Sequence, residues 1–420
     1  MSNNPLDKPS VIIAAILGSA IGALFYNVLP LYLGMLQEYR GIDNVGIGFV
    51  GFIFFLGWNV ITLSAFFWIR RFNWQVIAAI CSLLAVLSLM VTAWLFSYYG
   101  LLLAVFVTGG ACSGIYGLCT TVIGDTSQAA RWFGLKIAAE GALGAILFLV
   151  LPSLVIADYG FNGLTLALGV VVLLLSPALF YLPSQGNKNV GTTTINHNAE
   201  SSRNETAKKA IYLMLGATLL WFCGQTIMWS FVERIGSAAG HSSEEVGNVL
   251  AACLAAAMSG SIVATFIGDR FGTLQPFMIS SALFLLACPV IMDSHVFSSY
   301  LIGATLVMFS VGLGIPYCFS IVAALDKDGR YTILAVPAIG VGMMVAPGLA
   351  GTLSADGSYG LLVSAAGLLV ILGMGLSVLS LRSAKDHHLS AREILSFNLS
   401  LSAIEGYYSS IYYLEGKQYG

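Results

Sequence analysis

The sequence predicts an all-α membrane protein in which twelve transmembrane helices form two pseudosymmetric six-helix bundles. Composition, the length of the apolar runs and the placement of the basic residues lead to this prediction. Of the 420 residues, 58% are hydrophobic and 9% are charged, whereas a soluble globular domain carries about 25% charged residues. A surface so poor in charge requires lipid as its solvent. We therefore expect a multi-pass protein of the cell (inner or plasma) membrane.

The apolar runs are long enough to cross the hydrocarbon core as helices, which takes about 20 residues, whereas strands of a membrane barrel need only about 10 alternating residues. Charge-poor runs of helical length cover residues 11–36, 45–69, 74–98, 101–124, 133–157, 161–182, 210–232, 246–267, 274–292, 296–325, 331–355 and 359–381. We therefore expect helices as the spanning elements.

Lysine and arginine are distributed unevenly between alternate loops. If the N-terminus is cytoplasmic, every Lys and Arg except Arg40 and Arg234 falls on the cytoplasmic side. Cytoplasmic loops of membrane proteins carry an excess of these residues. The pattern therefore predicts that both termini are cytoplasmic.

A single long polar stretch, rich in Asn, Ser, Thr and Gly, interrupts the apolar runs and has the composition of a flexible linker. The expected organisation is an N-terminal bundle over 1–182, a cytoplasmic linker over 183–209, a C-terminal bundle over 210–382 and a cytoplasmic tail over 383–420. For the tail, an interfacial helix and a disordered segment remain alternatives.

Charged patterns at the ends of corresponding runs recur in the same order in both halves. Glu38-Tyr39-Arg40-Gly41 ends the first run, and Glu233-Arg234-Ile235-Gly236 ends the seventh. The second and eighth runs both end in basic loops, and the fourth and tenth runs lead into an aspartate followed by an arginine. These correspondences indicate an internal duplication, and parallel repeats are a known plan of transporters.

The loop after the eighth run carries the most specific motif. The stretch from Gly260 to Gly272 contains Gly268-Asp269-Arg270-Phe271-Gly272, and it is similar to the Gly-x-x-x-Asp-Arg-x-Gly loop motif of the major facilitator superfamily. The resemblance covers the twelve runs up to Leu381. The corresponding loop of the first half, from Trp68 to Trp74, keeps the positive charge but lacks the aspartate and both glycines.

The resemblance implies alternating access, in which two six-helix bundles rock about a central site. We expect Asp269 to act as a latch acceptor for Arg131 and for the free N–H groups at the start of the fifth helix, and Arg270 to turn toward Asp125. Arg330, with Asp326 or Asp328, is the mirror candidate. The alternative is that these charges only solvate the loop ends.

Lys136 and Glu140 are charged residues inside an otherwise uncharged run. Because they are four residues apart on a helix, they share a face and can form an ion pair. Charge at membrane depth costs about 2.5–3.5 kcal/mol on insertion scales. In one interpretation Glu140 faces the central cavity and binds substrate, a proton or both. In the other, Lys136 neutralises Glu140 and the pair only holds the helix.

Polar and aromatic side chains inside the runs are the remaining candidates for binding a small-molecule substrate. Their alternative role is to hold helices together or to lie at the headgroup level. The resemblance places the first, fourth, seventh and tenth helices around the cavity. On this basis the expected substrate-binding residues, besides Glu140, are Asn27, Tyr116, Trp221, Gln225 and Tyr317.

The sequence favours a secondary active transporter or facilitator of a small, neutral or weakly charged organic solute, with proton coupling left open. No nucleotide-binding loop of the Gly-x-x-x-x-Gly-Lys-Ser/Thr kind occurs, and no cofactor, metal site or nucleic-acid partner is expected. The seven cysteines lie in apolar runs and are expected to be free packing residues. A transporter-like sensor or assembly factor is one alternative. A membrane-embedded enzyme is another, but it requires a cluster of His, Asp or Glu at membrane depth.

Overall fold

We describe the fold from a computed structural model of the full chain. The structure describes residues 5–69, 71–95, 97–126, 129–184, 203–268, 270–325 and 335–385. In this part of the chain all regular secondary structure is helical, which confirms the all-α class. The helices of the first half are α1 (Pro9–Arg40), α2 (Asn44–Trp68), α3 (Trp74–Thr92), α4 (Tyr98–Gly124), α5 (Ala129–Leu151) and α6 (Ala157–Leu175).

The helices of the second half are α7 (Arg203–Ala238), α8 (Ser243–Ile267), α9 (Leu274–Met292), α10 (Phe297–Leu325), α11 (Ala335–Leu353) and α12 (Gly360–Lys385). A 3-10 turn, η1 (Pro5–Asp7), precedes α1. A π-helical turn, η2 (Pro152–Ile156), follows α5, and a 3-10 turn, η3 (Ser176–Tyr181), follows α6.

Local sequence signals explain where several helices begin and end. The Asp43 carboxylate accepts a hydrogen bond from the Gly46 N–H at 2.8 Å and caps α2. Ser242 and Glu245 form a capping box at the start of α8, which satisfies backbone donors that the first helical turn leaves free. At the end of α1, Gly41 takes the left-handed conformation (φ 64°) that favours glycine.

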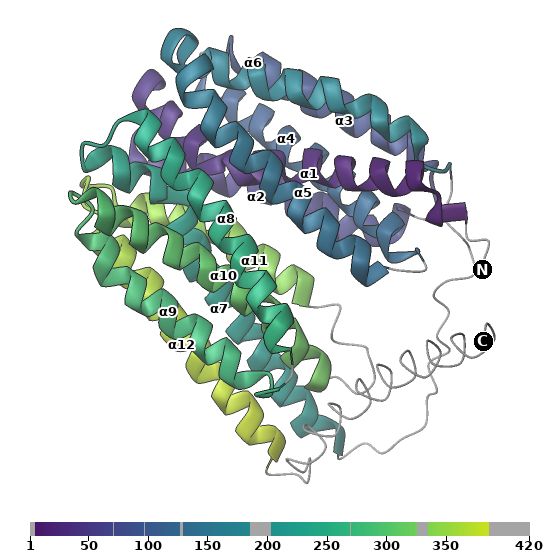
Figure 1. The fold of residues 1–420 in the computed structure, drawn as a ribbon, viewed down its shortest axis with the longest axis vertical. Helices are drawn as coiled ribbons and strands as arrows, with labels where there is room; N and C mark the ends of the chain where they lie inside the picture. Colours follow the sequence, from purple (N-terminus) through teal and green to yellow (C-terminus); the bar gives the residue numbers. More distant parts are fainter. Residues whose placement is uncertain are drawn as a thin grey trace, which may run out of the picture.

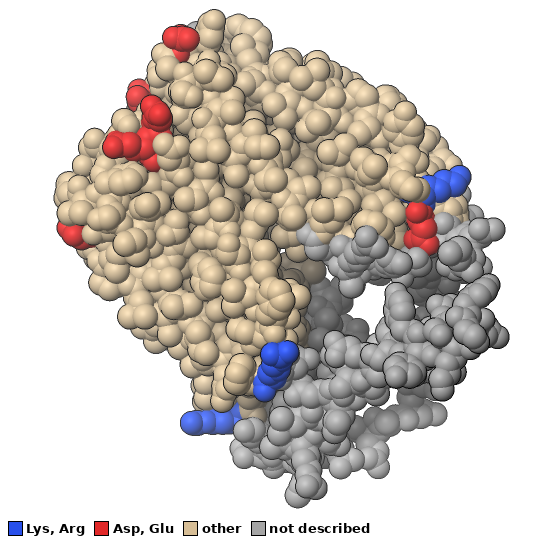
Figure 2. Space-filling model, in the orientation of Figure 1, with Lys and Arg blue, Asp and Glu red and all other residues tan. Residues whose placement is uncertain are grey.

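The outer surfaces of the helices are apolar, as the predicted membrane environment requires. Leu103, Leu174 and Leu286 are each more than 60% exposed. On the face shown in Figure 2, charged side chains lie only toward the two ends, and an uncharged belt separates them. In the described residues, eleven stretches are long and apolar enough to cross a bilayer, and one of them runs for 47 residues from Leu135 to Tyr181.

Figure 1 shows α1–α6 on one side of the molecule and α7–α12 on the other. The two groups meet near the C-terminal ends of α1 and α7, which we call the Arg40 end. They spread apart toward the N-terminal end of α1, which we call the Lys8 end. In the described residues, the main contacts between the groups are those of α1 with α7, of α2 with α11, and of α5 and η2 with α8.

The two halves are not identical at the repeated charged pattern. Helix α1 ends within its pattern, at Arg40, whereas α7 continues past the end of its pattern, Gly236, to Ala238. Glu233 therefore lies inside α7, and its side chain is 2% exposed. The two charged patterns that correspond in the sequence therefore differ in position: the first lies at the end of its helix, and the second lies inside its helix.

Candidate functional site

A charged pair lies inside α5 and is almost completely buried. The Lys136 ammonium is 2.7 Å from Oε1 of Glu140, and the two side chains are 3% and 12% exposed. The spacing of four residues brings them onto one face, so the predicted pairing is confirmed. The pair has no net charge, which reduces the cost of placing it at membrane depth.

Helix α1 supplies the polar partners of Glu140. The Ser19 hydroxyl donates a hydrogen bond to Oε1 of Glu140, and the Asn27 side-chain amide donates to the Glu140 backbone carbonyl at 3.0 Å. Within the described residues, Oε2 of Glu140 has no hydrogen-bond partner. One carboxylate oxygen therefore remains available to a ligand or a proton.

Aromatic rings extend from the charged pair into the first half of the molecule. The Lys136 ammonium lies 3.8 Å from the centre of the Tyr116 ring on α4, in cation–π geometry. The Tyr116 ring lies 5.4 Å from the ring of Trp58 on α2, and Tyr26 on α1 packs on Phe55 at 6.0 Å. Tyr26, Trp58 and Tyr116 are all partly exposed. We call Ser19, Tyr26, Asn27, Trp58, Tyr116, Lys136 and Glu140 the α5 site.

The structure brings three of the six predicted substrate-binding residues into the α5 site: Asn27, Tyr116 and Glu140. It places the other three elsewhere. The Trp221 indole N–H donates to the Ser281 hydroxyl at 3.0 Å, and its ring packs on Phe277. Gln225 donates to the Ser310 hydroxyl at 3.3 Å. These contacts hold α7 against α9 and α10.

Tyr317 has a different position again. Its hydroxyl donates to the backbone carbonyls of Ala264 and Gly268, both at 3.1 Å, and the residue is 3% exposed. It therefore fixes the C-terminal end of α8, directly before the loop motif. Its contacts make it a positioning residue for that loop.

Ser19 was not predicted, although it contributes directly to the α5 site. The available signal was its position seven residues before Tyr26, which places the two side chains on one face of α1. A serine inside an apolar helix also forms hydrogen bonds within its own helix, so composition alone gives it no special role.

The predicted latch falls largely outside the described residues. Asp269, Arg330 and the side chain of Arg131 lie there, together with Asp326 and Asp328. Asp125 caps the C-terminal end of α4 and is 8% exposed. Arg270, just after α8, is exposed.

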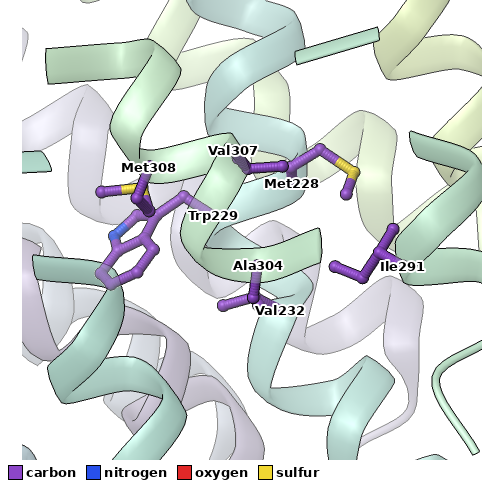
Figure 3. A pocket seen from close by; sticks show the side chains of 7 residues that line it. All are labelled: Met228, Trp229, Val232, Ile291, Ala304, Val307 and Met308. Atoms are coloured by element: carbon purple, nitrogen blue, oxygen red, sulfur yellow. The ribbon is translucent and has the colours of Figure 1, made fainter. Parts of the chain in front are cut away.

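Two cavities lie away from the α5 site. Figure 3 shows an apolar void between α7, α9 and α10, beside Trp229, that is too narrow to admit a water molecule. A groove of 330 Å³ lies on the surface between α2 and α11 and is lined by apolar side chains such as Phe49, Phe52 and Leu349. In the described part of the chain, no three His, Cys, Asp or Glu side chains are grouped to hold a metal ion.

Comparison with known proteins identifies the class. The family model of the Major Facilitator Superfamily matches residues 11–328. The chain therefore belongs to the Major Facilitator Superfamily, a family of membrane transporters. A search of curated proteins finds no match.

Solved transporter structures share the fold. A bacterial homolog of the human lysosomal transporter Spinster, in an inward-facing and unoccupied conformation, has a TM-score of 0.63 and 15% identity, over 93% of this chain and 98% of that chain. A D-xylose-proton symporter has a TM-score of 0.72 and 12% identity, over 87% and 96% of the two chains. The nucleoside transporter NupG has a TM-score of 0.65 and 13% identity, over 91% and 99%.

Proposed function

We propose that this protein is a secondary transporter that moves a small, neutral or weakly charged organic solute by alternating access. In this proposal the chain crosses the cell membrane twelve times, as two six-helix bundles over 1–182 and 210–382, with both termini in the cytoplasm. The linker over 183–209 and the tail over 383–420 are then cytoplasmic as well.

The longest apolar stretch supports the count of crossings. A straight helix from Leu135 to Tyr181, of 47 residues, would be about 70 Å long, whereas the hydrocarbon core is about 30 Å thick. The backbone leaves helical geometry at Gly160 (φ 56°, ψ −147°). The stretch is therefore long enough for two crossings that are joined near Gly160. Counting it as two crossings gives twelve spans from the eleven candidate stretches.

The single observation that carries the proposed transport role is the unpaired oxygen of Glu140, Oε2, among partly exposed aromatic rings. This oxygen can accept a hydrogen bond from a hydroxyl or amine group of a solute. The faces of Tyr116 and Trp58 can cover an apolar face of the same molecule. Because Lys136 already balances the Glu140 charge, a neutral solute adds no uncompensated charge to the site.

The same arrangement supports proton coupling. Protonation of Glu140 would remove the ion pair with Lys136, while Tyr116 would still hold the ammonium through its ring. A D-xylose-proton symporter shares this fold. We propose that Glu140 takes up the coupled proton and that the solute and the proton bind to the same carboxyl group.

For the Lys8 end we propose that Asp125, Arg131, Asp269, Arg270 and Arg330 form the closing contacts when the two bundles come together there. Tyr317 supports this role, because its hydroxyl fixes the α8 carbonyls directly before Asp269. The buried position of Asp125 at the end of α4 provides an acceptor close to the same end.

The experiment is uptake into liposomes that contain the purified protein and an entrapped pH dye. A pentose, a nucleoside, a primary amine and a carboxylate of similar size are supplied with and without a pH gradient. We expect one of the neutral or weakly charged solutes to enter together with protons, and we expect Glu140→Gln to abolish the dependence of uptake on pH. The matched control is Glu244→Gln, because Glu244 is an exposed carboxylate at the start of α8. Equal pH dependence in the Glu140 variant and the wild type would refute the role of Glu140.

A further inference from the structure

A second buried charged group lies at the Arg40 end, far along α7 from the linker. The Glu233 carboxylate accepts hydrogen bonds from Nε of Arg234 at 2.7 Å and from Nη2 of Arg234 at 3.0 Å, and the Ser237 hydroxyl donates to it at 2.7 Å. Glu233 and Arg234 are 2% and 8% exposed. Neither Glu233 nor Arg234 belongs to the α5 site.

The pair is joined to the other half of the molecule. Nη1 of Arg234 donates to the side-chain oxygen of Gln37 on α1 at 3.0 Å. The Glu233 carboxylate also lies against the backbone of Gly34, where an added Cβ would stand 1.9 Å from Oε2. A side chain at position 34 would therefore displace the Glu233 carboxylate from its place against α1.

Each of the two helices is fixed to its own half at this end. Arg40, at the end of α1, donates to the Ala93 carbonyl after α3 at 2.9 Å and to Asn162 on α6 at 3.1 Å. On α7, the Val232 carbonyl accepts a hydrogen bond at 2.9 Å from the hydroxyl of Tyr300 on α10. A movement that separates the two halves at this end therefore separates Gln37 from Arg234.

A second contact closes the same end between α2 and α11. The Asn44 side-chain amide donates to the Ser354 carbonyl. Gly48 and Gly351 let the two backbones approach, since an added Cβ at Gly48 would lie 2.9 Å from Cα of Gly351. The start of α8 also packs at this end, on the end of α5 and on η2, where an added Cβ at Gly247 would lie 2.7 Å from the Phe148 carbonyl oxygen. Among these contacts, the charged one is between α1 and α7.

We propose that Gln37, Gly34, Glu233 and Arg234 form a lock that holds the Arg40 end closed and that breaks each time the transporter opens toward that side. The inference rests on the proposed alternating access. When the halves separate, Arg234 and Glu233 remain paired within α7, so opening exposes a satisfied ion pair. Of the four lock residues' contacts, the hydrogen bond to Gln37 and the close packing on Gly34 are the ones lost.

The lock is tested by two substitutions that act on the closed state. Gln37→Ala removes the acceptor of Arg234, and the loss of one hydrogen bond to a charged group corresponds to roughly a tenfold change in the ratio of open to closed molecules. Gly34→Ala places a methyl group where the Glu233 carboxylate lies, so we expect it to favour opening as well. Neither substitution affects the open state, because Gln37 and Gly34 no longer contact α7 once the halves have moved apart.

The readout is the distance between spin labels, measured by electron paramagnetic resonance in lipid nanodiscs. Labels at Tyr99→Cys and Ser298→Cys, both exposed, report on the Arg40 end, and labels at Phe72→Cys and Phe271→Cys report on the Lys8 end. The partly exposed Cys81 and Cys288 are changed to serine in every sample. In both lock variants we expect the first distance to lengthen and the second to shorten.

Two matched controls separate the lock from general loosening. Gln75→Ala removes side-chain hydrogen bonds to the carbonyls of Phe180 and Leu182, which belong to the same half as Gln75. Gly216→Ala adds a methyl group on α7, where the nearest atom would lie at 3.6 Å. Both controls should leave the two distance distributions as in the wild type.

The proposal fails if the lock variants give the distance distributions of the wild type, or if the controls shift the distances equally. If Gly34→Ala does not fold, Gln37→Ala still tests the proposal, because it creates no steric overlap. The distances are measured without a solute, so a negative uptake experiment would overturn the proposed function and leave this test intact.

Discussion

The Lys136–Glu140 pair yields a quantitative prediction about stability. Removing one partner of a buried ion pair costs about 3–5 kcal/mol, because the remaining charge has no compensation. For Glu140→Gln the cost is reduced, since the Tyr116 ring, 3.8 Å from the ammonium, retains a cation–π interaction of up to about 2 kcal/mol. We therefore expect a loss of about 2 kcal/mol in the free energy of unfolding.

The partner substitution, Lys136→Met, leaves the Glu140 carboxylate with the Ser19 hydrogen bond only. We expect the free energy of unfolding to fall by about 2 kcal/mol or more, because a buried charge then lacks its partner. The double variant Lys136→Met with Glu140→Gln removes both charges and keeps similar side-chain volumes, so it should lose only about 1 kcal/mol. The coupling energy between the two positions is then about 3 kcal/mol.

The assay is unfolding of the four proteins by transfer from mild detergent into mixed micelles with sodium dodecyl sulfate, followed by tryptophan fluorescence. Glu244→Gln is the control, because it shows how much stability changes when an exposed carboxylate is replaced by an amide. If the two single losses add to give the loss of the double variant, the pair contributes no coupling, and the electrostatic account of the α5 site is wrong.

Three further predictions concern residues around the α5 site and the loop motif. Tyr317→Phe removes hydrogen bonds to two α8 carbonyls and should cost about 1–2 kcal/mol; amide hydrogen exchange just after Gly268 should accelerate while exchange in α5 stays unchanged, and unchanged exchange after Gly268 would contradict the positioning role. Tyr116→Leu should destabilise the protein by about 1–2 kcal/mol relative to Tyr116→Phe, because only the ring can cover the Lys136 ammonium; equal unfolding curves for the two variants would exclude the cation–π contribution. Asn27→Ala removes the side-chain donor that holds α1 to the Glu140 backbone carbonyl at 3.0 Å and should weaken solute uptake more than Asn59→Ala, whose amide instead donates to the Gly340 carbonyl between α2 and α11; the reverse order of uptake would argue against the α5 site.

The fold class and the pairing of Lys136 with Glu140 could be predicted from sequence because both depend on short-range rules. Apolar length determines which segments form spanning helices, and a spacing of four residues determines which side chains share a helix face. The structure follows both rules. The break at Gly160 falls in the gap between the predicted runs 133–157 and 161–182.

The neighbours of individual polar residues could not be predicted in the same way. Membrane helices are apolar on the lipid side and on the protein side alike, so periodicity does not separate the two faces. Trp221 and Trp229 are eight residues apart on α7, a separation that turns the side chain by about 80°. Trp221 accordingly bonds Ser281 on α9, whereas the Trp229 indole N–H donates to the Tyr26 carbonyl on α1 at 3.5 Å.

The same reason explains the lock at the Arg40 end. The sequence indicated that Glu233 and Arg234 mark the end of a run, by analogy with Glu38 and Arg40. Whether a charged residue at such an end reaches its own half or the other depends on the crossing of the helices. In the structure Arg40 contacts α6 of its own half, and Arg234 contacts α1 of the other.

The location of the solute site is tested most directly by a cryo-electron microscopy map of the protein with the solute identified in the uptake experiment. We expect density for the solute within hydrogen-bond distance of Oε2 of Glu140 and in contact with the rings of Tyr116 and Trp58. Density enclosed by α7, α9 and α10 next to Trp221, with the α5 site unchanged, would contradict this account.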